Sequence, residues 1–265
     1  MTCVALLAVS ALGASCGTTT SAPNSPSGST VSLFFLHGGT LGVAHKRVIP
    51  SSSGVGSSLP AAALEALLSG PTNDQLSEGL SSAIPAGVRL MNLSVSGGTA
   101  VANLSSTFSS GAGVQPSPGR IGEVVFTLTQ FPAIQQVLIQ VNAQTPPTAT
   151  GDPPLGQPVD RAQLDALLPG IFVESPASAD DISAGTIDVS GLTDVAQFTV
   201  EVIDSTGTTV VNQVVNTNAT AGTWVPFSVV AYLAHAAPGP AQLQVFSVAA
   251  DGSHTNVLPV PLMIG

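Results

Sequence analysis

The sequence predicts two folded domains in series, an α+β domain over residues 31–145 and an all-β sandwich over residues 170–265. Three observations lead to this prediction. The first half combines short strand patterns with helix patterns, one of which has clear start and stop signals. The second half contains mainly strand-like segments, which recur at the spacing of roughly 8 to 12 residues typical of a sandwich. The third observation is that the two halves differ in net charge.

Acidic residues are concentrated in the second half. Up to residue 150, four basic residues balance four acidic ones, but from residue 151 onward Arg161 stands against eleven acidic residues. The second half therefore carries the whole net charge of −10. A disordered acidic tail is the alternative, but the acids are interleaved with Val, Ile, Phe and Leu at strand-like spacing, which favours a folded domain. No basic patch is present, so nucleic acid is not an expected partner.

The clearest helix signal lies at residues 61–70. Leu64, Leu67 and Leu68 have the spacing of one apolar helical face. Gly70 can adopt the left-handed conformation that ends a helix, and Pro71 cannot continue one. This helix is expected to pack its leucines on a sheet.

The other elements of the first domain follow from alternation and turn signals. In the strand expected at residues 88–95, the alternation predicts that Arg89, Met91, Leu93 and Val95 point inward. The remaining elements are strands at 31–36, 41–49, 100–104 and 137–141, and a helix at 120–130.

The segment 146–169 is proline-rich, with one short amphipathic turn, and predicts a linker. Beyond it, Trp224 and Phe227 are expected in the core of the sandwich. Its strands are expected at 171–174, 185–189, 196–203, 208–215, 224–230, 241–249 and 258–264.

Both cysteines, Cys3 and Cys16, lie close to the start of the sequence, so the folded domains can form no disulfide. Residues 1–15 predict a signal peptide, because their apolar run is too short to span a bilayer of roughly 30 Å. Residues 12–16 resemble the lipobox of bacterial lipoproteins, which implies cleavage before Cys16 and lipid attachment to its sulfur. The leucine lies one place further from the cysteine than usual and no Lys or Arg precedes the run, so a secreted protein with an incidental cysteine is the alternative. Residues 16–30 read as a disordered tether.

The first domain resembles the sporulation and spore-germination domain called GerMN. The resemblance is carried by the ordered segments FFL, ALEALLSGPT, GLSSAIPAGVRL, GGTAVANLSSTF and VVFTLTQFPAIQQVLIQVNA. It implies a small α/β domain on the outer side of the cytoplasmic membrane, related in shape to the ring-building modules of secretion and sporulation complexes. It implies no known catalytic residues.

The second domain resembles the immunoglobulin-like domain often found after GerMN in bacterial spore-germination proteins. The matching segments are FVESP, DSTG, GTWVPFSV and QVFSVAADGSHTNVLPVPL. The sequence lacks the cysteine pair of antibody domains, so its core must be held by packing alone.

Few residues have the spacing of a chemical site. His37 and His45 flank the first hairpin, but without a third ligand they are better explained as polar residues at its mouth. Asp180, Asp181 and Asp188 suggest calcium, although adjacent aspartates at a strand entry more often serve as turn residues. The sequence contains no GxSxG, HExxH, Walker or dinucleotide motif. We therefore expect no catalytic residue, cofactor or metal.

These observations favour a non-catalytic, lipid-anchored protein on the extracytoplasmic face of a bacterial membrane. Its expected partners are the membrane, through the anchor, and envelope proteins or peptidoglycan. The alternative is a cell-wall hydrolase or hydrolase activator, which would need a cleft with a carboxylate of raised pKa, and the first domain offers few acids for one: Glu65, Asp74, Glu78 and Glu123. Self-assembly through the first domain is a third hypothesis.

Overall fold

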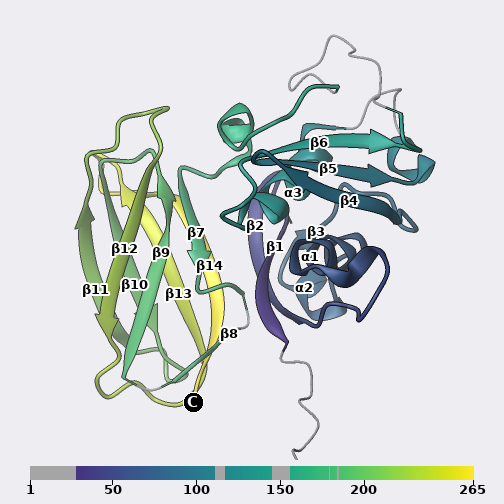
Figure 1. Ribbon diagram of the computed structural model, residues 1–265. Helices are drawn as coiled ribbons and strands as arrows, with labels where there is room; N and C mark the ends of the chain where they lie inside the picture. The colour runs from purple at the N-terminus through teal and green to yellow at the C-terminus, as the bar shows by residue number, and fades with distance from the viewer. Residues whose placement is uncertain (1–27, 111–116, 145–155, 179, 184) are drawn as a thin grey trace, which may run out of the picture.

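The computed structural model describes residues 28–110, 117–144, 156–178, 180–183 and 185–265. Two domains lie side by side (Figure 1). The predicted signal peptide, Cys16 and nearly all of the predicted tether lie outside the described residues. Among those described, no helix has the length and apolar character needed to cross a membrane.

The first domain has two small sheets with helices between them, as Figure 1 shows. One sheet has the order β2-β1-β3 and the other β4-β5-β6. Helix α1 contacts β1 and β4, and helix α3 contacts β1 and β6, so the helices join the sheets. The elements are β1 (Ser29–His37), β2 (Thr40–Val48), η1 (Val55–Ser57), α1 (Leu59–Leu68), α2 (Asn73–Ser77), β3 (Leu80–Ser81), β4 (Leu90–Ser96), β5 (Thr99–Leu104), η2 (Ser106–Ser109), α3 (Pro118–Thr129) and β6 (Gln136–Val141).

Both helix predictions are confirmed. The side chain of Ser58 accepts a hydrogen bond from the Ala61 N–H at the start of α1, and Gly70 lies just beyond its end with φ of +77°. Helix α3 buries Ile121, Val124, Val125 and Leu128, which share one helical face, and Phe126 and Thr127 are also fully buried. A helix enclosed by two sheets and a connecting segment has no solvent face, which explains this burial.

The inward face predicted for β4 is wrong in part. A bulge lies between Leu90 and Asn92, and it reverses the alternation, so that the buried Leu90 lies on the same face as Leu93. Met91 and Val95 are 50% and 43% exposed. Arg89 is exposed as well, contrary to the prediction. Leu93 packs against the core of the first domain as predicted, whereas Val95 lies on the same face nearer the end of this edge strand and stays exposed.

The second domain is a sandwich of two sheets, as expected. Their orders are β11-β10-β13-β14-β8 and β12-β9-β7. All seven expected strands are present, and the short β8, which pairs in parallel with β14, was not predicted. The strands are β7 (Ile171–Ser175), β8 (Asp180–Ile182), β9 (Thr186–Thr193), β10 (Gln197–Ile203), β11 (Thr209–Asn216), β12 (Val225–Tyr232), β13 (Gly239–Val248) and β14 (His254–Ile264).

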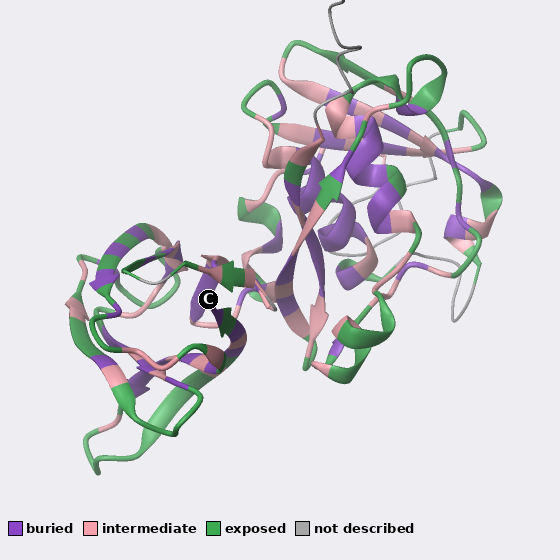
Figure 2. Cartoon of the chain, turned by 90° about the horizontal axis from the view of Figure 1, so that it is seen from below, coloured by how far each residue is buried: buried purple, intermediate pink, exposed green. Residues whose placement is uncertain are grey.

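The sandwich core has the alternating burial expected of two facing sheets, visible as the purple bands of Figure 2. Phe227 packs edge-on against Phe198 with ring centroids 4.9 Å apart. Trp224 does not join this core, contrary to the prediction. It is half-buried and packs instead against the apolar cluster shared with the first domain.

The described part of the proline-rich segment packs against the first domain. Val159 pairs with Val137 of β6, and the short helix η3 (Ala162–Leu167) buries Leu164 in the first domain's core. The second domain therefore starts from a chain that is already fixed to the first.

Candidate binding site between the domains

Three phenylalanines form the centre of the contact between the domains. Phe34 of β1 and Phe126 of α3 belong to the first domain, and Phe172 of β7 belongs to the second. Their ring centroids lie 5.5 to 6.2 Å apart. Ile171 and Val173 point into the sandwich, so alternation directs Phe172 out of it. The resulting apolar contact, which we call the seam, continues the core of the first domain into the second.

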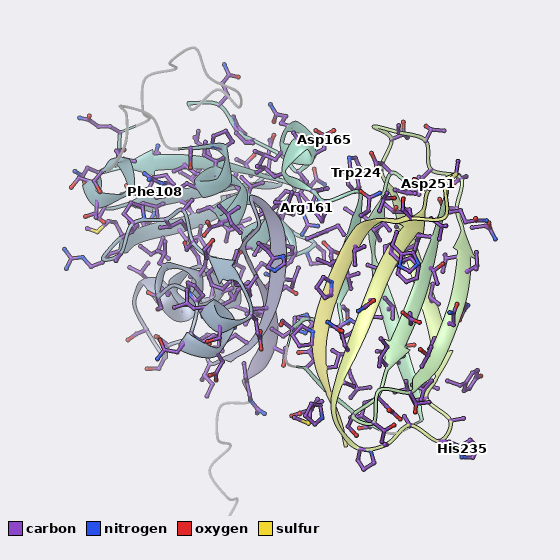
Figure 3. The ribbon with its side chains drawn as sticks, turned by 180° about the vertical axis from the view of Figure 1, so that it is seen from behind. Phe108, Arg161, Asp165, Trp224, His235 and Asp251 are labelled. Atoms are coloured by element: carbon purple, nitrogen blue, oxygen red, sulfur yellow. The ribbon has the colours of Figure 1, made fainter. Side chains whose placement is uncertain are left out.

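Arg161, from the connecting segment, covers the seam (Figure 3). Its guanidinium carbon lies 4.7 Å from the ring centroid of Phe126. Its Nη1 lies 2.7 Å from Oε1 of Glu174 on β7, and its Nε donates to Oγ1 of Thr129 on α3 over 2.8 Å. One planar cation therefore binds both domains.

A second set of polar contacts joins the domains at the β8 end of the seam. Nδ1 of His45 lies 2.7 Å from Oδ2 of Asp180, and the same oxygen accepts the Ala177 N–H over 2.9 Å. Oγ of Ser178 donates to Oε2 of Glu78 over 2.5 Å. His45 and Asp180 are 135 residues apart in the sequence, and Glu78 and Ser178 are 100 residues apart, so no local pattern predicted these two contacts.

Two cavities flank the seam. The smaller, of about 40 Å³, is mainly apolar and has little room for more than water. The larger, of about 390 Å³, is polar and open. Thr30 and His45 form its first-domain wall. The rest comes from the end of β7, from β8 and β9, and from residues on either side of β8: Ser175, Pro176, Asp180, Asp181, Ile182, Ser183, Thr186, Ile187 and Asp188. We call this larger cavity the polar cleft.

The polar cleft adds His45 to the three aspartates that the sequence had suggested for calcium. Asp180, Asp181 and Asp188 all line it, together with His45. His37 lines the smaller cavity instead, so the two histidines do not form the pair considered for a metal. Among the residues that the structure describes, no group of three or more His, Cys, Asp and Glu side chains could hold a metal ion.

The outer face of β9 and β12 continues from the polar cleft. Thr186 is paired with Tyr232 and Asp188 with Val230, so these four side chains share one face. Tyr232 is 74% exposed and Val230 is 53% exposed. Sequence reasoning missed this face, although the alternation along residues 224–232 contains the signal.

Comparison with known proteins identifies both domains. Residues 32–145 match the family described as "Sporulation and spore germination", and residues 170–253 match the "Immunoglobulin-like domain of bacterial spore germination". The chain is a GerMN-type domain followed by this immunoglobulin-like domain. No curated protein matches it.

Two solved structures with GerMN domains are similar to the chain. The tandem GerMN domains of the sporulation protein GerM from Bacillus subtilis are 16% identical, and the match covers 76% of this chain and 60% of that one, with a TM-score of 0.41. The first GerMN domain of the same protein is 24% identical, with 50% and 98% covered and a TM-score of 0.37.

Within the GerMN domain, Glu123 of α3 is the buried carboxylate. It is 0% exposed, and its oxygens accept the Ser82 hydroxyl and the Ala83 N–H, each over 2.6 Å. Burial raises its pKa from the ordinary 4.5 to about 7, against the opposing effect of these hydrogen bonds and of nearby Arg120. The raised pKa is what a hydrolase would need, but the carboxylate is enclosed in the core and lines none of the three cavities described.

The other acids of the GerMN domain lie apart from Glu123. Glu65 lines a separate recess of about 270 Å³ with Arg89, and Glu78 is bonded to Ser178 at the seam. Asp74 lies in the first turn of α2. The described acids of this domain therefore do not form the facing pair that glycoside hydrolysis generally uses.

Proposed function

We propose that this chain is a non-catalytic, lipid-anchored cell-envelope protein that acts as a binding or assembly module of the sporulation and germination type. Lipid on Cys16 would hold it at the extracytoplasmic face of the membrane. Its partners would be envelope proteins or peptidoglycan.

The observation that carries this proposal is the seam. Two domains of germination-associated families are joined through a buried aromatic cluster and through Arg161. Domains joined by a mainly apolar contact present their surfaces in a fixed relation, as a composite binding face requires. The enclosure of Glu123 favours this role over the hydrolase alternative.

Lipid attachment is tested by substituting the two cysteines. In cells, Cys16→Ser should release the protein from the membrane fraction and abolish labelling by a radioactive fatty acid. Cys3→Ser is the matched control, because it lies in the segment expected to be removed, and it should leave both readouts unchanged. Labelling that persists in Cys16→Ser contradicts the anchor.

The binding role is tested by cross-linking in intact cells and by sedimentation with purified peptidoglycan. We expect the wild-type chain to be recovered with discrete envelope proteins or with the wall fraction. If neither is found, and if the purified chain releases soluble fragments from cell wall, the hydrolase alternative replaces this proposal. Loss of that release in Glu65→Gln or Glu123→Gln would identify the acid responsible.

Strand β4 favours self-assembly as a second candidate function. It is the edge of its sheet, its seven residues carry no charge, and Met91 and Val95 are exposed on it. An uncharged edge is a template for pairing with another strand. In sedimentation equilibrium, Val95→Lys should abolish any concentration-dependent association of the Cys16→Ser chain, and a wild-type chain that stays monomeric throughout rules this candidate out.

A further inference from the structure

We propose that the outer face of β9 and β12, together with the polar cleft, binds a saccharide chain, with Tyr232 as its stacking platform. The inference rests on the envelope role proposed above and names the class of ligand. It is carried by the exposure of Tyr232, by the side chains around it and by the position of the cleft.

The platform consists of two exposed residues on one strand. Tyr232 is the only tyrosine of the chain, and it is 74% exposed where β12 ends. Val230 lies on the same face, while Val229 and Ala231, the neighbours of Val230 on either side, point into the core. An aromatic ring held on a rigid strand offers its face at little entropic cost. The C–H face of a sugar ring packs on such a surface and leaves the hydroxyl groups at the rim free.

Hydrogen-bonding side chains lie beside the platform. Thr186 and Asp188, which pair with Tyr232 and Val230, also line the polar cleft, and Thr30 and Asp180 lie across it. Hydroxyl and carboxylate oxygens accept hydrogen bonds from the O–H and acetamido N–H groups of a saccharide. The carboxylates disfavour an anionic polymer, so charge favours a neutral, donor-rich ligand.

The cleft is continuous with the contact between the domains. Its volume of about 390 Å³ falls in the range of roughly 300 to 1,000 Å³ typical of ligand sites. His45 forms part of the GerMN wall, and its bond to Asp180 holds that wall against the immunoglobulin-like domain. The site therefore requires both domains.

Binding on the face is favoured over the addition of a peptide strand at the edge of β12. Pro226 lies within β12 and has no N–H to donate. Strand addition depends on an unbroken row of such groups. A ligand that stacks on side chains has no such requirement.

The test uses the full chain carrying Cys16→Ser, with a hexamer of N-acetylglucosamine and purified peptidoglycan sacculi as probes. We expect saturable binding of both. Tyr232→Ala should bind about tenfold more weakly, in line with the loss of an aromatic contact, and Tyr232→Phe should retain the affinity. Val214→Ala is the matched control, because Val214 is similarly exposed at 55% but lies on β11 of the other sheet.

Two results would overturn the inference. One is the absence of saturable binding to either probe, and the other is unchanged affinity in Tyr232→Ala. Preferential binding of an extended peptide, with no binding of the hexamer, would also overturn it. In each case, if Tyr232→Ala still cross-links to envelope proteins, the chain remains a binding module and only the saccharide site is ruled out. Failure of this inference is therefore distinguishable from failure of the proposed function.

Discussion

The burial of Glu123 makes the stability of the protein depend on pH. A carboxylate removed from water is costly in its charged form, and here the cost exceeds the stabilisation from its two hydrogen bonds, so its pKa rises to about 7. Arg120 lies one helical turn away, but its side chain donates to backbone carbonyl oxygens, including those of Ala83 and Phe108, and forms no ion pair with Glu123.

The free energy of unfolding should therefore fall as pH rises from about 4.5 to about 7. Within this window Glu123 keeps its proton in the folded state and loses it in the unfolded state. The free energy of unfolding is therefore highest below the pKa of Glu123 in the unfolded chain, and the decrease is complete once pH exceeds its pKa in the folded protein. The loss should total roughly 3 kcal/mol. Urea unfolding of Glu123→Gln and wild type at pH 5 and pH 8 measures most of this loss.

Glu123→Gln should remove this part of the pH dependence, because the amide stays neutral at both values. Glu65→Gln makes the same change at an exposed side chain and should leave the wild-type pH profile intact. Parallel pH profiles for Glu123→Gln and wild type would show that Glu123 does not titrate in this window.

Among the helices and strands, the sequence predicted those features that depend on residues close together in the chain. The end of α1 just before Gly70 and the seven expected strands of the sandwich follow from periodicity, capping and turn residues. The bulge at Met91 is an insertion that an alternating pattern cannot reveal. Trp224 was expected in the sandwich core, but it packs against the apolar cluster that the second domain shares with the first. The polar cleft was not predictable, because its two walls belong to different domains.

The connecting segment was expected to be a linker, and Arg161 explains why it lies against both domains. Arg161→Lys keeps the charge but loses the planar stacking on Phe126 and the fork of donors to Glu174 and Thr129. We expect it to lower the free energy of unfolding by about 1 to 2 kcal/mol. Denaturant unfolding monitored by circular dichroism measures the change.

Arg89→Lys is the control for this substitution. Arg89 is exposed, so the same change there should shift stability by no more than about 0.5 kcal/mol. If Arg161→Lys behaved like Arg89→Lys, the stacking and the fork of donors would contribute nothing measurable.

For the whole molecule, we expect the seam to make the two domains one cooperative unit. The core of the first domain includes Phe172 and Ala177 of the second, and both ion pairs found among the described residues lie at the domain contact or beside it. Because a buried apolar contact must be broken before either domain can move alone, we expect a single unfolding transition.

A double-mutant cycle on Phe34→Ala and Phe172→Ala tests this coupling. The two rings come from different domains, with centroids 6.1 Å apart, so their destabilising effects should be non-additive by about 0.5 to 1.5 kcal/mol. Phe34→Ala combined with Phe198→Ala is the matched control, because Phe198 is as deeply buried but belongs to the sandwich core alone. That pair should be additive within about 0.5 kcal/mol. Equal additivity of both pairs would mean that the domains fold independently and that the seam does not hold the polar cleft together.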